Sequence, residues 1–265
     1  MSFKAKKKLG QHFLVDKNII RKIVEIFSPA ENDLIVEIGP GNGALTEELI
    51  KYSKKLILVE IDKELIPDLE NKFPEVKILN KDILDCDFSK EFFDAKFRII
   101  GNLPYYITSQ ILFKIFDNYH LVNDALIMIQ KEVAQRIVAH KGTKDYGILS
   151  VFAQFYSEPK ILFNVSKNVF YPKPKVDSSI IHLKMKQRVE LSEQEEKCFR
   201  HVVKTAFNQR RKTLRNSLKN LFTENDLVFY EKFFSMPFDL SRRAEELSLT
   251  DFIYLAKNFC KIKHT

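Results

Sequence analysis

The stretch Leu34-Ile-Val-Glu-Ile-Gly-Pro-Gly-Asn-Gly-Ala44 decides the fold of this chain. Its first five residues, Leu34 to Ile38, are mostly apolar and β-branched, which predicts a buried strand. Glycines at alternate positions follow, and a helical pattern begins at Leu45. Glycine lets a ligand approach the backbone, and the N-terminal end of a helix is electropositive. The stretch therefore predicts a strand, a turn and a helix that together bind a nucleotide or a nucleoside.

The alternation of strand and helix continues along the chain. Apolar runs recur between helical stretches, and such a chain builds a parallel sheet with both faces covered. The last two runs have no helix between them, which predicts an antiparallel hairpin at one edge. The sequence thus predicts an α/β, Rossmann-like fold. The expected strands are residues 34–38, 56–60, 76–79, 97–100, 125–129, 160–165 and 178–184.

The strand pattern disappears after residue 186. Ser192 and Glu195 have the spacing of a capping box before a long helical stretch, and Thr250 is a candidate cap for another helix. We therefore expect two domains: residues 1–186, which contain the sheet, and residues 187–265, which form a small all-helical domain.

The composition is that of a folded, basic protein. The chain has 265 residues, of which 45% are hydrophobic, and a formal net charge of +8, which suggests a polyanionic partner. Residues 186–265 hold +5 of this charge, with 16 Lys and Arg against 11 Asp and Glu. No apolar run approaches membrane-spanning length, so we expect a cytoplasmic protein. Three widely separated cysteines predict neither a disulfide framework nor a metal site.

Three further strand ends carry polar residues. Glu60 ends the second expected strand, Asp82 follows the third and Asn102 follows the fourth. Ligands of open α/β sheets bind at the carboxyl ends of the strands, so these side chains should meet near the glycine turn. Glu60 suits a ribose diol, and Asp82 can accept a hydrogen bond from an adenine amine. S-adenosylmethionine needs both groups.

Two alternatives remain at this point. The glycine spacing and Glu60 also fit the fingerprint of an NAD-binding protein. Taken singly, Glu60 or Asp82 is explained equally well by a helix cap or a solvated turn. The ordered set of strand ends carries more weight than any one of its members.

The turn Asn102-Leu-Pro-Tyr105 suggests methyl transfer to an amino group on a flat base. The Asn102 oxygen and a nearby backbone carbonyl can accept hydrogen bonds from an exocyclic amine and so turn its lone pair toward an electrophile. Proline stiffens the turn, and Tyr105 offers a stacking face. Asn102, Leu103 and Tyr105 are the candidate catalytic residues. Taken alone, the tetrapeptide is better explained as ordinary turn chemistry.

Five motifs in order along the chain resemble those of the ribosomal RNA adenine dimethyltransferases. The first and last favour the branch that acts on the small ribosomal subunit over the related large-subunit enzymes that confer macrolide resistance. The resemblance implies a class I S-adenosylmethionine-dependent methyltransferase fold with a seven-stranded sheet and a helical C-terminal domain. The motifs are Lys8–Leu14, Glu37–Gly43, Asn102–Tyr105, Phe170–Ser178 and Phe207–Asn216.

The resemblance also implies an activity: S-adenosylmethionine-dependent N6,N6-dimethylation of two adjacent adenosines near the 3′ end of 16S ribosomal RNA, in small-subunit biogenesis. It adds Phe170 to the catalytic residues, closing the second face of the target base, although without the resemblance Phe170 would be a core residue. His12 stands where relatives commonly have Asn. No general base or metal is expected. The implied cofactor-binding residues are His12, Leu14, Gly39, Glu60, Asp82 and Asn102.

Basic residues of the tail are candidates for contacting RNA. Arg210, Arg211, Lys212 and Arg215 fall within two turns of an expected helix, with Arg211 and Arg215 on one face. A solvated basic face is the ordinary explanation, and the Lys4–Lys8 arm is the next candidate. We expect a monomer whose partner is ribosomal RNA in the assembling small subunit. The alternatives are a large-subunit adenine methyltransferase and a non-enzymatic RNA-binding assembly factor.

Overall fold

The structure, a computed structural model, describes residues 6, 9–92, 96–222 and 227–263. The chain divides into two compact units. The first comprises residues 1–134 and 156–187, and the second comprises residues 135–155 and 188–265. The chain leaves the first unit close to the predicted boundary. Residues 135–155, which the prediction grouped with the sheet, belong to the second unit.

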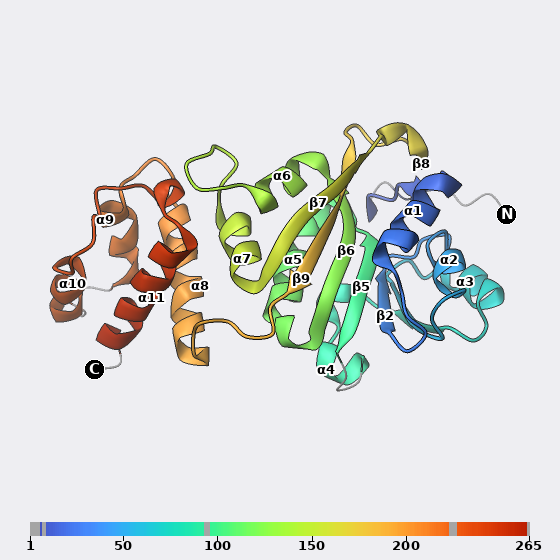
Figure 1. Cartoon of the computed structure of the whole chain (residues 1–265), viewed down its shortest axis with the longest axis horizontal. Coiled ribbons are helices and arrows are strands. Elements are labelled where there is room, and N and C mark those ends of the chain that lie inside the picture. Colours follow the sequence, from blue (N-terminus) through green and yellow to red (C-terminus); the bar gives the residue numbers. More distant parts are fainter. Residues whose placement is uncertain (1–5, 7–8, 93–95, 223–226, 264–265) are drawn as a thin grey trace. The chain divides into compact units, whose positions relative to one another are not determined.

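A seven-stranded sheet forms the centre of the first unit (Figure 1). Its strand order is β4-β3-β2-β5-β6-β9-β7, and β9 runs antiparallel to both of its neighbours. The predicted parallel sheet with an antiparallel pair is therefore confirmed. β7 is the edge strand, and β9 is inserted between β6 and β7. The strands are β2 (Leu34–Ile38), β3 (Lys55–Glu60), β4 (Lys77–Asn80), β5 (Phe97–Asn102), β6 (Val122–Gln130), β7 (Ser157–Val165) and β9 (Ser178–Met185).

Helices connect the parallel strands. α1 begins after Asp16, whose carboxylate accepts hydrogen bonds from the backbone N–H groups of Asn18 and Ile19. The 3-10 helix η2 (Ile83–Asp85) follows β4 directly. The α-helices that lie wholly in this unit are α1 (Lys17–Phe27), α2 (Thr46–Leu49), α3 (Ile66–Lys72), α4 (Phe88–Glu91) and α5 (Thr108–Asp117).

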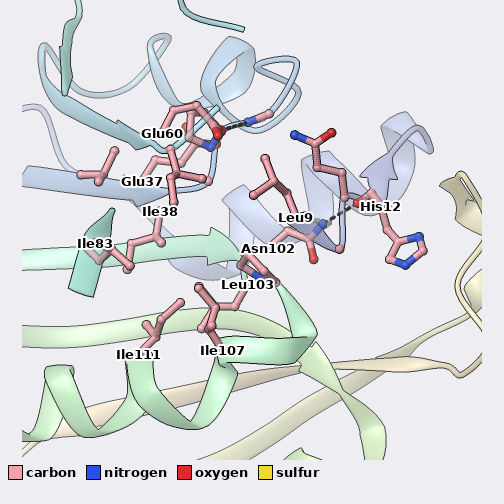
Figure 2. Close-up of a pocket in the computed structure, with 18 of the residues that line it drawn as sticks. Leu9, His12, Glu37, Ile38, Glu60, Ile83, Asn102, Leu103, Ile107 and Ile111 are labelled. Atoms are coloured by element: carbon pink, nitrogen blue, oxygen red, sulfur yellow. Dashed lines mark hydrogen bonds between the residues drawn. The ribbon is translucent and has the colours of Figure 1, made fainter. Parts of the chain in front are cut away.

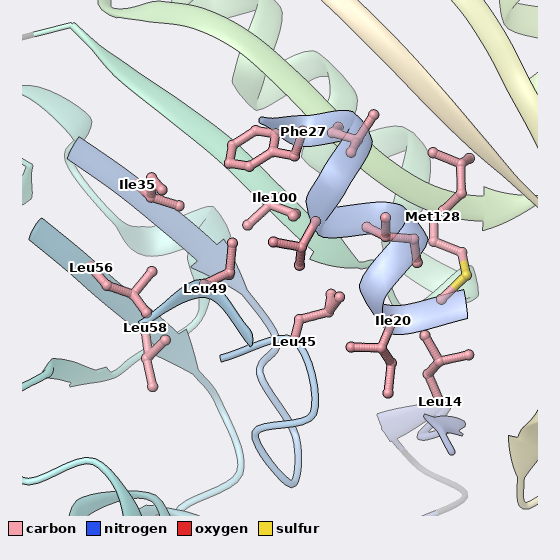
Figure 3. Close-up of a cluster of buried hydrophobic side chains, with 14 of the residues drawn as sticks. Leu14, Ile20, Phe27, Ile35, Leu45, Leu49, Leu56, Leu58, Ile100 and Met128 are labelled. Carbon is pink, nitrogen blue, oxygen red and sulfur yellow. The ribbon is translucent and has the colours of Figure 1, made fainter. Parts of the chain in front are cut away.

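One apolar cluster holds α1 against the sheet (Figure 3). Ile20 and Phe27 on the buried face of α1 join Ile35 of β2, Ile100 of β5 and Met128 of β6 in this cluster. Each of these side chains is at most 6% exposed. Burying a large apolar side chain contributes about 1.5–3 kcal/mol, so the cluster fixes the strand ends that carry the predicted site.

Arg98 ties the opposite end of the sheet together. Its guanidinium donates two hydrogen bonds to Asp124, at 2.7 and 2.9 Å, and one to Asp33 at 2.8 Å. His182 lies 2.9 Å from Asp124. Burial raises the pKa of Asp124, but the hydrogen bonds from Arg98 and His182 outweigh burial and hold the pKa below its usual value.

A second, two-stranded sheet was not predicted. β1 (Phe13–Leu14) pairs antiparallel with β8 (Phe170–Tyr171), with Phe13 opposite Tyr171 and Leu14 opposite Phe170. This pairing joins the segment before α1 to the loop between β7 and β9.

The second unit is helical. The predicted capping box is present at the start of α8, where Ser192 and Glu195 bond reciprocally. The prediction for Thr250 was wrong, because α11 begins at Leu249 and the Ser248 hydroxyl accepts the hydrogen bond from the Asp251 N–H. α6 (Lys131–Val138) and α7 (Ile148–Tyr156) cross the boundary between the units. The remaining helices are α8 (Glu193–Phe207), α9 (Leu214–Ser217), α10 (Leu227–Phe234) and α11 (Leu249–Lys263).

Candidate active site

A cleft lies at the carboxyl ends of β2, β3, β4 and β5 (Figure 2). The cleft is open to solvent, and the empty space within it, open solvent included, is about 940 Å³. The structure brings most of the predicted site residues together here. Those that line the cleft are His12, Leu14, Gly39, Glu60, Asp82, Asn102, Leu103 and Tyr105.

The glycine turn forms one wall. Gly39, Gly41 and Gly43 all have positive φ, between 59° and 83°. Other residues rarely adopt this conformation, which explains the spacing of the motif. At Gly41 a Cβ would lie 2.9 Å from the ring of Phe13, so the N-terminal segment packs directly on the turn.

Glu60 supplies a buried carboxylate beside the turn. Its Oε2 accepts a hydrogen bond from the Gly41 N–H at 3.1 Å, and its Oε1 accepts one from the Asp62 N–H at 2.8 Å. Burial raises the pKa of Glu60, and these two hydrogen bonds oppose the rise. A carboxylate has about four acceptor sites, so Glu60 keeps acceptor capacity that a ribose hydroxyl can use.

Asp82 accepts one hydrogen bond from the backbone and can accept others from a ligand. Its Oδ1 accepts a hydrogen bond from the Leu84 N–H at 2.9 Å and so caps η2. The next residue, Ile83, is buried and lines the cleft. An acceptor next to a buried apolar side chain suits the edge and face of an adenine ring.

Asn102 is held in one orientation by the N-terminal segment. Its Nδ2 donates a hydrogen bond to the backbone carbonyl of His12 at 2.8 Å (Figure 2). A carbonyl can only accept, so this bond fixes the amide with its nitrogen toward His12. Among the residues that the structure describes, Oδ1 has no partner, so it is available to accept from a ligand.

Tyr105 and His12 form the wall next to Asn102. Their rings stack with centroids 5.6 Å apart, and the Tyr105 hydroxyl lies 2.7 Å from Ser178 Oγ. His12 Nδ1 donates to the Pro172 carbonyl at 2.7 Å. The Leu103 N–H lies 3.0 Å from the Met128 carbonyl, and this bond joins the turn to β6.

Phe170 is the exception among the predicted catalytic residues. It is 4% exposed, belongs to the apolar cluster under α1 and does not line the cleft. The structure therefore places it as the core residue that the sequence alone suggested. Leu14, its partner across the β1–β8 pair, lies in the same cluster and also reaches the cleft.

Glu37 also lines the cleft, although the sequence did not predict it as a site residue beyond its place in the glycine motif. It is 1% exposed, and its Oε2 accepts a hydrogen bond from the Thr46 hydroxyl at 2.7 Å. Burial raises the pKa of Glu37 to about 8; the Thr46 bond opposes the rise and the nearby Glu60 adds to it. The sequence does contain a signal for Glu37, because it is an acidic residue inside a strand that is otherwise apolar.

A polar clasp fixes the N-terminal segment to the far side of the cleft. We use the term for Lys6, Gln11 and Asp62. Asp62 is 4% exposed and accepts hydrogen bonds from Lys6 Nζ at 2.6 Å and from Gln11 Nε2 at 2.8 Å. The only sequence signal for this contact is that Gln11 belongs to the motif Lys8–Leu14. The rest of the predicted Lys4–Lys8 arm lies outside the described residues.

The predicted RNA-binding residues are not on one helix. α8 ends at Phe207, so Arg210, Arg211 and Lys212 lie in the turn that precedes α9, and the predicted shared helical face was wrong. The Arg210 guanidinium donates hydrogen bonds to the carbonyls of residues 144 and 146, at 2.7 and 3.1 Å. Arg215 is in α9, 5.6 Å from the ring centroid of Phe234.

Within residues 6, 9–92, 96–222 and 227–263, no helix is long and apolar enough to cross a membrane. The same residues contain no group of three or more His, Cys, Asp or Glu that could hold a metal ion.

Comparison with known proteins gives a consistent result. A family profile described as "Ribosomal RNA adenine dimethylase" matches residues 2–257. The ribosomal RNA small subunit methyltransferase A of Caldanaerobacter subterraneus subsp. tengcongensis is 45% identical over 260 residues, 96% of each chain. That of Mycoplasma mobile is 43% identical, over 97% of this chain and 100% of the relative.

Solved structures agree in fold. A dimethyladenosine transferase from Plasmodium falciparum superposes with a TM-score of 0.80 at 26% identity, covering 95% of this chain and 98% of the other. The 23S rRNA methyltransferase ErmE superposes with a TM-score of 0.67 at 24% identity, covering 93% and 99%, and shares the fold. The resemblance predicted from the five motifs is confirmed: the chain belongs to the ribosomal RNA adenine dimethylase family.

Proposed function

We propose that the chain is an S-adenosylmethionine-dependent methyltransferase that dimethylates N6 of two adjacent adenosines near the 3′ end of 16S ribosomal RNA. The observation that carries the proposal is the fixed amide of Asn102. Its nitrogen is engaged by the His12 carbonyl, so its oxygen faces outward as an acceptor at the end of β5. Tyr105, three residues later, lines the same cleft.

The cleft fits the cofactor. Glu60 would accept hydrogen bonds from the ribose hydroxyls and Asp82 from the adenine amine, with Ile83 against the ring face. The positive-φ glycines let the chain pass close to the ligand without side chains in the way. His12 and Leu14 would cover the ligand from the N-terminal segment.

In the proposed reaction the chain aligns the target amine and stabilises charge. Asn102 Oδ1 and the carbonyl of Leu103 would accept from the adenine N6, so the developing positive charge on nitrogen meets preorganised dipoles. Tyr105 would stack on the base. When bound, S-adenosylmethionine supplies the methyl group, whose bond to sulfur breaks as the amine nitrogen attacks, while an amine proton leaves to water. Asn102 can bind the monomethyl amine again, so two transfers per base are expected.

The small subunit is favoured over the large subunit as substrate. The relatives named small-subunit methyltransferases are 42–45% identical to this chain over at least 94% of its length, whereas ErmE is 24% identical. We also propose that the enzyme acts as a monomer on the assembling subunit.

The helical residues 187–265 would position the RNA. Arg211 and Lys212 are exposed in the turn before α9, and residues 186–265 hold +5 of the net charge. Arg210 bonds within its own unit and also lies 3.2 Å from Glu245, so it is better suited to shaping this turn than to contacting phosphate. Replacing Arg211 and Lys212 with Gln should reduce the salt dependence of RNA binding by a slope of about 1 per lost phosphate contact.

The decisive experiment incubates the protein with unmethylated small subunits and labelled S-adenosylmethionine and analyses the nucleosides. We expect dimethyladenosine at completion. Asn102→Ala should lower the rate by about 100-fold or more while the fold persists. Asn258→Ala, which removes a partly exposed amide on α11, is the matched control.

Calorimetry separates the cofactor alternatives. Binding of S-adenosylhomocysteine without binding of NAD is expected. Tight NAD binding alone, or methylation of cytosine or guanine, would contradict the proposed pocket. Near-normal turnover by Asn102→Ala would show that the turn is structural.

A further inference from the structure

An exposed tyrosine stands beside the cleft without a part in the chemistry above. Tyr171 of β8 is 71% exposed, the largest fraction among the exposed large hydrophobic side chains of the described residues. Its partner across the β1–β8 pair is Phe13. Residues directly opposite in an antiparallel pair point to the same face, and the Phe13 ring packs on the glycine turn at Gly41. Tyr171 therefore lies on the same face of the small sheet as Phe13.

The loop that follows Tyr171 is anchored to the cleft wall. The next residue, Pro172, accepts the hydrogen bond from His12 Nδ1 at 2.7 Å. At the other end of the loop, Ser178 Oγ lies 2.7 Å from the Tyr105 hydroxyl. Both anchors contact residues that line the cleft, so the Tyr171 backbone has a fixed place next to the target-base turn.

Lysines lie on the same loop. Lys173 and Lys175 are exposed, and no ion pair involves either of them among the residues that the structure describes. The nearby acid, Asp177, accepts a hydrogen bond from the Lys167 N–H at 2.9 Å, and its carbonyl accepts one from the Lys131 N–H. An exposed aromatic ring next to cations without ion-pair partners is a combination that binds single-stranded nucleic acid.

We propose that Tyr171 stacks on a base adjacent to the target adenosine, while Lys173 and Lys175 contact the phosphates of that strand. A base bound by Asn102 and Tyr105 lies inside the cleft, whereas Tyr171 is exposed and does not line the cleft. The Tyr171 ring can therefore stack on a base next to the target adenosine but not on the target itself. The inference rests on the proposed function in that the substrate is RNA.

Steady-state methylation of unmethylated small subunits tests the proposal. Tyr171→Ala should raise KM for the subunit by about 10-fold, the loss expected for one stacked base, with little change in kcat or in affinity for S-adenosylhomocysteine. Tyr171→Phe keeps the ring and should behave as wild type. Tyr52→Ala removes another half-exposed tyrosine that does not line the cleft and is the matched control.

The contribution of Lys173 and Lys175 is tested separately, through the salt dependence of RNA binding. Lys173→Gln with Lys175→Gln should reduce the slope of log K against log salt by about 1.4 for single-stranded RNA. The pair Lys54→Gln with Lys55→Gln, at the opposite end of β3, should leave the slope unchanged.

A direct probe keeps the test independent of turnover. A short single-stranded RNA carrying 2-aminopurine next to an adenosine should be quenched by wild type and by Tyr171→Phe, but not by Tyr171→Ala. Equal KM values and equal quenching for wild type and Tyr171→Ala would overturn the proposal. So would a loss of S-adenosylhomocysteine affinity that parallels the rise in KM. A wild-type protein that quenches the probe but transfers no methyl group would instead refute the proposed function.

Discussion

Replacing Glu37 with glutamine should stabilise the protein at neutral pH. Burial raises the pKa of Glu37 from 4.5 to about 8, so the folded protein keeps this carboxyl protonated while the unfolded chain ionises it. A folded pKa above the unfolded value gives stability that is fully present below pH 4.5 and is lost as the pH rises through about 8. Glutamine is neutral at every pH and can keep a hydrogen bond with Thr46, so it removes this loss.

The size of the gain follows from the two pKa values. A difference of one in pKa is worth about 1.36 kcal/mol, so the interval from 4.5 to about 8 sets a ceiling of about 5 kcal/mol. Glu37 lines an open cleft, and water entering there solvates the carboxylate, so we expect about 2–4 kcal/mol at pH 8. This is a large part of the 5–15 kcal/mol that stabilises a typical domain.

Urea unfolding of wild type and Glu37→Gln across this pH range measures the effect. The two curves should coincide near pH 4.5 and separate as the pH rises toward 8. Glu70→Gln, an exposed glutamate on α3, should track wild type throughout. Parallel curves for Glu37→Gln and wild type would show that the carboxyl is already ionised in the folded protein and would refute the reasoning.

Three further outcomes are expected. Gly101→Ala would place its Cβ against a backbone carbonyl of β2, so it should cost about 1–3 kcal/mol of stability in urea unfolding, whereas Gly147→Ala, with nothing within 4 Å, should not. Asp62→Asn weakens the clasp; faster hydrogen exchange at residues 9–14 and lower affinity for S-adenosylhomocysteine should follow, and unchanged exchange would show that the clasp is dispensable. Because the folded pKa of Asp124 is held low, its contribution to stability is present above about pH 4 and is lost as the pH falls through the folded pKa. Acid unfolding of Asp124→Asn should therefore show a shallower pH dependence than wild type.

The sheet could be predicted because its signals are local. Strand β2 was predicted with its observed bounds, since a β-branched run followed by a glycine turn depends only on adjacent residues. The polar residues Glu60, Asp82 and Asn102 could be placed at one edge because parallel strands share a direction. The family motifs then added His12 and Leu14, for which the sequence offers no periodic signal.

The missed contacts depend on register and on distant partners. Two-residue strands have no period, so the β1–β8 pair could not be foreseen. This pair turns Phe170 toward the core and Tyr171 toward solvent. Arg210 was expected on a helix with phosphate-binding residues. Its actual partners, the carbonyls of residues 144 and 146, lie more than sixty positions earlier in the chain.

The hydrogen bond between Asn102 and the N-terminal segment explains why the chain can carry His12 at this position. The resemblance described under Sequence analysis implies Asn at this place, whereas this chain has His12. The group that orients Asn102 is the backbone carbonyl of residue 12, which every amino acid carries. The side chain at this position is therefore under a weaker constraint than the path of the backbone. In this chain the His12 ring makes two contacts of its own: it donates a hydrogen bond to the Pro172 carbonyl and stacks on Tyr105. The N-terminal segment thus contributes to the proposed chemistry through its conformation, and substitutions that move the segment should impair methyl transfer more than substitutions of the His12 ring.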